Sequence, residues 1–203
     1  MNQLCQVGLI SLLPIIQVAY IGAAYTIVQL GTEYDPRSLL RRYFSVIYIP
    51  FIFGIGGVYL ASVGLPPITV RPEFLLGVPV GAGAYYLTTL GWRYYTGNPI
   101  RRGDRELHLN AVGVTGALPE ELLFRAGLAP LISWVGSTGY LLYSSVLFGV
   151  YHYDGQLNEV IFKMLLGVLL GTAYLWSGSV VVPICIHFGY NLAWVLFVTG
   201  RFP

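Results

Sequence analysis

Ionisable side chains interrupt apolar stretches at three places in the second half of the sequence, and the first place holds two carboxylates and a guanidinium. Residues 118–127 read Leu-Pro-Glu-Glu-Leu-Leu-Phe-Arg-Ala-Gly. Glu121 and Arg125 are four residues apart, so on a helix they share one face and can form an ion pair. Glu120 points about 100° away around the helix and has no partner in this stretch. It is therefore the carboxylate that is free to exchange a proton during a reaction.

Two histidines, each paired with a residue four positions away, occupy the second and third places. Phe148 and His152 share a helical face in one apolar stretch, and His187 and Asn191 share a face in another. A glutamate and a histidine together can deprotonate a water molecule. A histidine and an asparagine can donate hydrogen bonds to an oxyanion. This combination of side chains is the one needed to hydrolyse a peptide bond.

Other chemistries for the same side chains find less support in the spacing. The HExxH pattern of zinc proteases is absent, so we expect no metal, and zinc is kept as an alternative. A haem held by two histidines would leave the glutamates and the arginine without a role. The two cysteines lie in apolar stretches and are expected to be packing residues. A structural salt bridge remains an alternative to a direct catalytic role for Glu121 and Arg125.

The elements that must position these residues are membrane helices, because the chain has too few charges to cover a surface in water. Of its 203 residues, 56% are hydrophobic and 10% are charged, whereas about 25% are charged in an average soluble domain. This composition excludes an ordinary soluble enzyme. The 11 basic and 9 acidic residues leave no polybasic face for nucleic acid. A charge at bilayer depth costs about 2.5–3.5 kcal/mol, which makes the buried ionisable groups functional candidates.

Seven apolar blocks predict an all-α fold, a polytopic transmembrane helical bundle with about seven membrane helices. The blocks cover residues 4–30, 43–65, 74–92, 111–133, 140–153, 160–176 and 180–198. We expect a single membrane domain over residues 1–203. Its first part, residues 1–110, holds the N-terminal spans and an arginine-rich loop. Its second part, residues 111–199, holds the motif-bearing helices.

The helices cannot all be straight if the three motifs form one site. On these block limits Glu120 lies in mid-bilayer, whereas His152 lies near the cytoplasmic end and His187 nearer the outer side. A common site therefore requires broken or tilted helices around a water-filled cavity, and Pro119 fits a helix start or a kink. A GxxxG spacing at Gly167 indicates close packing within the bundle and leaves dimerisation open.

The three motifs, in this order, resemble those of the CPBP family, which comprises CAAX proteases and bacteriocin-processing enzymes and is also called the Abi family. The family pattern is EExxxR, then FxxxH, then HxxxN or HxxxD, on separate membrane helices. The corresponding residues here are Glu120-Glu121-Leu-Leu-Phe-Arg125, Phe148-Gly-Val-Tyr-His152 and His187-Phe-Gly-Tyr-Asn191. The resemblance covers about residues 118–194. Ala126 departs from it, because many members have glycine after the arginine, and this difference concerns helix packing.

The resemblance implies a glutamate-type intramembrane endopeptidase, similar to the type II CAAX prenyl endopeptidases, that works without a metal cofactor. It implies that Glu120 and His152 activate the water, and that His187 and Asn191 hold the oxyanion. The supporting residues that it implies, which set the helix geometry, position the substrate and line the site, are Glu121, Arg125 and Phe148.

The resemblance also implies the surroundings and partners of the protein. We expect a multi-pass integral protein of a prokaryotic plasma membrane, whose partners are the lipid bilayer and a peptide or membrane-protein substrate, and not nucleic acid. The sequence carries no signal for an oligomeric state. Three alternatives stay open: a non-proteolytic CPBP-like immunity or scaffold protein, a metal-dependent membrane protease, and a small transporter or proton relay built on the same side chains.

Overall fold

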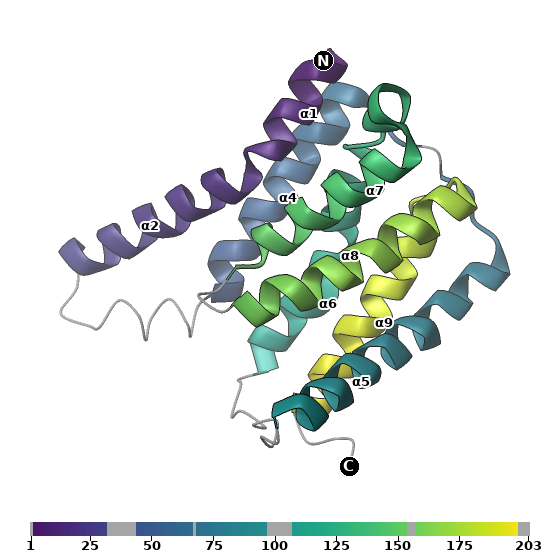
Figure 1. Ribbon diagram of the computed structural model, residues 1–203. Coiled ribbons are helices and arrows are strands. Elements are labelled where there is room, and N and C mark those ends of the chain that lie inside the picture. The colour runs from purple at the N-terminus through teal and green to yellow at the C-terminus, as the bar shows by residue number, and fades with distance from the viewer. Residues whose placement is uncertain (1, 32–43, 67, 97–106, 154–156, 199–203) are drawn as a thin grey trace.

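The computed structural model describes residues 2–31, 44–66, 68–96, 107–153 and 157–198, and all regular structure in these ranges is helical. The elements, in chain order, are α1 (Gln3–Ser11), α2 (Leu13–Gly31), α4 (Phe44–Val63), η1 (Pro72–Leu76), α5 (Gly77–Thr96), α6 (Leu107–Glu121), η2 (Leu122–Ala126), α7 (Leu131–Tyr151), α8 (Leu157–Ser177) and α9 (Val181–Val198). Most of them form one bundle (Figure 1). Most of the expected arginine-rich loop, residues 97–106, lies outside the described residues.

Among the described residues, four helical segments are long and apolar enough to cross a membrane: residues 13–31, 72–92 (η1 with most of α5), 131–151 and 157–177. Two shorter apolar helices cover residues 47–63 and 181–197. The all-helical class is thus confirmed, with four candidate membrane-spanning helices. The expected count of about seven is not confirmed.

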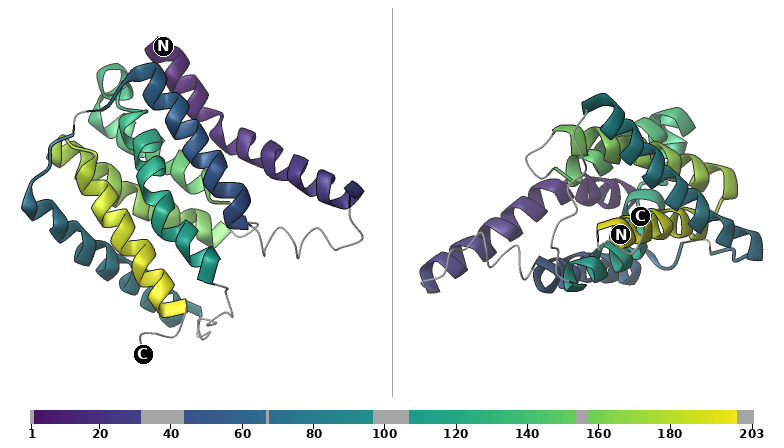
Figure 2. Two further views of the ribbon diagram at one scale, coloured as in Figure 1. Left: turned by 180° about the vertical axis from the view of Figure 1, so that it is seen from behind. Right: turned by 90° about the horizontal axis from the view of Figure 1, so that it is seen from below.

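The first apolar block is two helices rather than one. α1 ends at Ser11 and α2 begins at Leu13. Pro14 falls in the first turn of α2, where its missing N–H costs least, whereas in the middle of one long helix it would remove a hydrogen bond. After this break Tyr20 of α2 still stacks on Phe51 of α4, and the end of α2 extends away from the other helices (Figures 1 and 2).

The fourth apolar block is also broken, which corrects the expectation of one span over residues 111–133. α6 ends at Glu121, and the next five residues form a π-helical turn, closed by a hydrogen bond of 2.9 Å from the Gly127 N–H to the Leu122 carbonyl. α7 then begins at Leu131. Pro119 lies in the last turn of α6 and cannot donate a backbone hydrogen bond there, which favours the departure from regular α-helix at this point.

Glycines set the closest helix contacts in the bundle. A Cβ added at Gly167 would lie 2.9 Å from the Ser145 Cα, and one at Gly171 would lie 2.7 Å from Leu141. Both neighbours belong to α7, so the GxxxG face of α8 packs within the bundle, as expected. The pair α5 and α9 is at least as close, because a Cβ at Gly81 would overlap the Ile186 carbonyl. These two helices run side by side in both views (Figures 1 and 2).

The contact between α5 and α9 fixes the position of α9, and substitution of its glycines tests this. We expect Gly81→Ala or Gly189→Ala to lower the midpoint of thermal unfolding in detergent, because each added methyl group would overlap backbone of the opposite helix. Overpacking of this kind costs about 1–3 kcal/mol. The matched control is Gly83→Ala, on the same helix, where an added Cβ has no atom within 4 Å. An equal loss in all three variants would contradict the close contact.

Candidate active site

The carboxylate of Glu120 is where the three sequence motifs meet. Glu120 is buried near the end of α6, and its Oε2 lies 3.3 Å from Nε2 of His152 and 3.9 Å from Nε2 of His187. His152 caps the C-terminal end of α7, and His187 lies in the first half of α9. Three separate segments thus place one carboxylate and two imidazoles together. The convergence that the sequence required is therefore present.

Both histidines turn the same ring nitrogen toward Glu120. His152 Nδ1 lies 2.8 Å from the backbone carbonyl of Phe148, and because a carbonyl oxygen only accepts, this nitrogen must carry the proton. His187 Nδ1 lies 2.9 Å from Oε1 of Glu121 and donates to that carboxylate. In a neutral ring, Nε2 then holds a lone pair. Each Nε2 is therefore available to accept a proton beside the Glu120 carboxylate.

Glu121 links the first motif to the third. Its Oε2 accepts a hydrogen bond of 2.8 Å from Nε of Arg125, which is the ion pair that the spacing predicts. Its Oε1 accepts from His187, a partner that the sequence did not indicate. All three side chains are buried. Glu121 therefore fixes the ring of His187 and balances the charge of Arg125 at once.

The guanidinium of Arg125 is fully buried and only partly hydrogen-bonded. Its Nη1 and Nη2 form no hydrogen bond with any residue that the structure describes. Its Cζ lies 5.0 Å from the centre of the Phe148 ring, within the range of a cation–π contact. The guanidinium thus contacts Glu121 and Phe148, and among the described residues it has no recorded interaction with Glu120.

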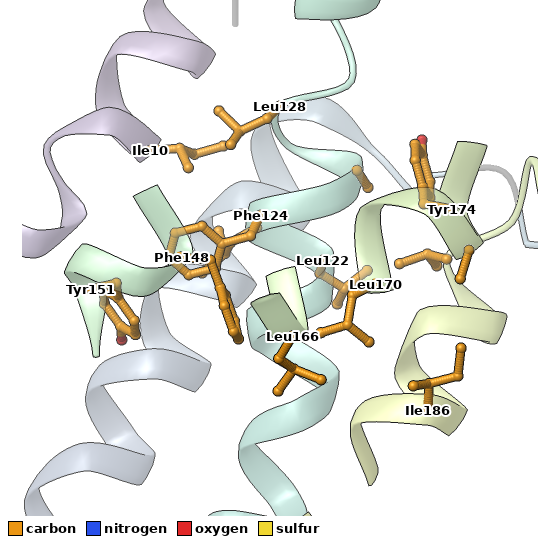
Figure 3. Close-up of a cluster of buried hydrophobic side chains, with 14 of the residues drawn as sticks. Ile10, Leu122, Phe124, Leu128, Phe148, Tyr151, Leu166, Leu170, Tyr174 and Ile186 are labelled. Carbon is orange, nitrogen blue, oxygen red and sulfur yellow. The ribbon is translucent and has the colours of Figure 1, made fainter. Parts of the chain in front are cut away.

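Phe148 packs against both histidines of the site, and its role in lining the site stays a prediction. Its ring centre lies 4.4 Å from that of His152 and 5.6 Å from that of His187. On the other side it packs edge-on against Phe124 of η2, with ring centres 5.4 Å apart. Figure 3 shows Phe148 beside Phe124, with Tyr151 close to both. This packing restricts the rotation of both imidazoles.

Asn191 lies one helical turn beyond His187 on α9 and is buried. The two side chains therefore share a face of that helix, as the spacing predicts. The role of Asn191 in holding an oxyanion stays a prediction.

Two tyrosines complete the site, and sequence reasoning missed both. The hydroxyl of Tyr48, on α4, donates a hydrogen bond of 2.6 Å to Oε1 of Glu120. The hydroxyl of Tyr151, the last residue of α7, donates to the Tyr48 hydroxyl over 3.2 Å. Tyr48 lies in residues 1–110, where the sequence predicted N-terminal spans and an arginine-rich loop. Tyr48 is one of 16 tyrosines and follows no motif, so only its contact distinguishes it.

A metal centre was the main alternative for these side chains. No group of three His, Cys, Asp or Glu side chains within the described ranges is arranged to hold a metal ion.

A groove of about 330 Å³ lies between α5 and α8, away from the candidate site. It is lined by Gly91, Trp92, Asn158, Ile161 and Phe162, and none of these is a site residue.

The pairing of Glu121 with Arg125 supports the fold, and a double substitution tests this. Glu121→Gln leaves a buried guanidinium without its carboxylate, which is expected to cost about 3–5 kcal/mol and to lower the midpoint of thermal unfolding. Combining it with Arg125→Met removes the stranded charge, so the double variant should regain most of the loss. A double variant less stable than Glu121→Gln alone would contradict the pairing.

Comparisons with known proteins agree with this geometry. Residues 107–193, just under half of the chain, match the family model described as "Type II CAAX prenyl endopeptidase Rce1-like". Comparisons with curated proteins and with solved structures gave no match. The matched range contains all three motifs and excludes Tyr48. The match confirms the resemblance to CAAX proteases, and with the apolar helices it indicates an integral membrane protein. Residues 107–193, the part of the chain that carries the three motifs, are thus similar to the Rce1-like family of type II CAAX prenyl endopeptidases.

Proposed function

We propose that the protein is a glutamate-type intramembrane endopeptidase that cuts membrane-associated or CAAX-like substrates with a water molecule activated by Glu120 and His152. The observation that carries the proposal is the position of Glu120 Oε2. This oxygen is buried, forms no hydrogen bond with a described residue, and lies within 3.9 Å of Nε2 of both His152 and His187. A basic oxygen beside two imidazoles is suited to accept a proton from water.

The first step forms the bond between water and the substrate. Glu120, as general base, takes a proton from water while the water oxygen attacks the carbonyl carbon of the scissile peptide bond. His152 Nε2, 3.3 Å from the carboxylate, shares this proton and later delivers it to the leaving nitrogen. The C–N bond then breaks, and a carboxylate and an amine leave. These reaction steps require no metal ion.

The reaction also needs two hydrogen-bond donors for the oxyanion, and we assign this role to His187 and Asn191. Nδ1 of His187 already donates to Glu121, so Nε2 can donate only when the ring carries both protons. The Glu121 carboxylate, 2.9 Å away, places a negative charge beside that cationic form. The amide of Asn191, one turn further on the same face, is the second donor. Donors of this kind typically contribute about 100- to 1,000-fold in rate.

The membrane setting determines how a substrate reaches this site. We infer a multi-pass protein of a prokaryotic plasma membrane with about seven spans, and the four long and two shorter apolar helices of the described residues support several membrane crossings. Because the site is buried among helices, the substrate would enter from the bilayer or the cytoplasmic face and present an extended C-terminal segment. A CAAX-like membrane-bound peptide has this form. Intramembrane carboxylates and histidines that face a bundle interior are typical of functional sites.

Glu120→Gln is the central test of the mechanism. The change keeps the shape of the side chain and the acceptor for Tyr48 but removes the base, so cleavage should fall by at least about 100-fold. The measurement is hydrolysis of a CAAX-like peptide by protein in liposomes. The control is Glu159→Gln, an exposed glutamate on α8, which should cleave like the wild type. Undiminished cleavage by Glu120→Gln would reject the mechanism.

Exhaustive chelation separates this mechanism from the metal-dependent alternative. We expect the purified protein to keep its rate of peptide hydrolysis after chelation, because Glu120 and His152 supply the base and the acid. The rate is measured before chelation, after it, and after addition of zinc. A complete loss that zinc restores would support the metal-dependent alternative instead.

A further inference from the structure

The hydroxyl of Tyr48 holds the proposed catalytic base from outside the part of the chain that matches the protease family. Tyr48 is buried on α4, and its hydroxyl lies 2.6 Å from Oε1 of Glu120. That distance is within the range of a hydrogen bond to a charged carboxylate, about 2.5–2.7 Å. We propose that Tyr48 is a positioning residue for the reaction: it holds Oε1 and leaves Oε2 as the oxygen that accepts the proton of water. This inference rests on the proposed function.

The two oxygens of Glu120 have different surroundings, and Tyr48 makes the difference. Oε1 accepts the tyrosine hydrogen bond, whereas Oε2 faces Nε2 of both histidines. Without the hydroxyl, rotation about the last side-chain bond could exchange the oxygens or turn both away from the imidazoles, because this terminal torsion is broad. A base must lie within about one hydrogen-bond length of the proton that it abstracts. Fixing one oxygen therefore keeps the other in place.

Tyr151 extends the same arrangement by one step. Its hydroxyl donates to the Tyr48 hydroxyl over 3.2 Å, and its ring packs against that of His152 with centres 5.3 Å apart. Two adjacent residues at the end of α7 thus act on the two oxygens of Glu120. His152 faces Oε2 directly, and Tyr151 is linked to Oε1 through the Tyr48 hydroxyl. Hydrogen bonds in such a chain polarise and strengthen one another.

The backbone beside Glu120 leaves room for this contact. A Cβ added at Gly116, one turn earlier on α6, would lie 3.0 Å from Oε1 of Glu120 and 3.8 Å from Cε1 of Tyr48. A larger residue would therefore press on the oxygen that Tyr48 holds. The glycine keeps the carboxylate and the phenol within hydrogen-bonding distance. The space left by Gly116 and the short hydrogen bond to the base favour a positioning role for Tyr48. The alternative is that Glu120 merely supplies a hydrogen-bond acceptor for a buried hydroxyl group.

The first experiment separates kcat from KM. Tyr48→Phe removes one oxygen and keeps the buried ring, so we expect kcat for a CAAX-like peptide to fall about 10- to 100-fold, the range for losing a hydrogen bond to a charged group. KM should stay close to that of the wild type, and the midpoint of thermal unfolding should fall, because Oε1 of the buried carboxylate loses its hydrogen bond. The control is Tyr59→Phe, a buried tyrosine further along α4, which should leave kcat unchanged. A wild-type kcat in Tyr48→Phe overturns the proposal.

A double-mutant cycle tests whether Tyr151 acts through Tyr48. Tyr151→Phe alone should lower kcat by less than Tyr48→Phe does. The double variant should be no slower than Tyr48→Phe alone, because Tyr151 has no route to Oε1 once the Tyr48 hydroxyl is gone. Effects that multiply in the double variant would show independent roles and overturn this part of the proposal.

A measurement that needs no activity completes the test. With tyrosine labelled by ¹³C at Cζ, the Tyr48 resonance is assigned by its loss in Tyr48→Phe. We expect it to shift in Glu120→Gln, since a neutral amide is a weaker acceptor than a carboxylate, and the Tyr59 resonance to stay in place. An unmoved Tyr48 resonance overturns the contact. Loss of cleavage in Glu120→Gln together with full kcat in Tyr48→Phe would reject this inference and keep the proposed function.

Discussion

The structure depends on keeping one carboxylate charged in apolar surroundings. A charge at bilayer depth costs several kcal/mol unless it is paired or hydrogen-bonded. Groups from three segments surround Glu120: the Tyr48 hydroxyl on α4 donates to it, and the imidazoles of His152, at the end of α7, and His187, on α9, pair with it when they carry a second proton. Because no single helix could supply all of them, the carboxylate requires the bundle around it. The groups that stabilise the charge are also those that would exchange protons with a substrate, so stability and proposed chemistry share the same contacts.

A second set of contacts makes this arrangement rigid. Adjacent residues on a helix point about 100° apart, so Glu121 faces away from Glu120 and toward Arg125 and His187. The imidazole that faces Glu120 on one side is thus held by Glu121 on the other. Phe148 packs against both histidines and the guanidinium, which limits ring rotation. A site that must hold a water and a carbonyl in line benefits from such restraint, because small displacements cost large factors in rate.

The depth at which the motifs meet follows from how the helices are broken and packed. The span that was expected over residues 111–133 ends as α-helix at Glu121 and continues through a π turn, so the carboxylates stand at a helix end inside the bundle. The close backbone contact between Gly81 of α5 and Ile186 of α9 fixes the position of α9, and with it the depth of His187 beside the carboxylates. Block limits placed the motifs at three different depths, since a hydropathy pattern records neither a break nor a tilt.

The sequence by itself determined which side chains are candidates and which class of fold carries them. Ionisable groups in apolar blocks are costly enough to be recognised as functional, and partners four residues apart, such as Glu121 and Arg125, are neighbours on any helix. Only the tertiary structure decided that His187 joins Glu121 and that Tyr48 holds Glu120. These contacts join residues 66 and 72 positions apart. Local spacing cannot specify them, because they depend on how separate helices cross and on which faces they turn toward one another.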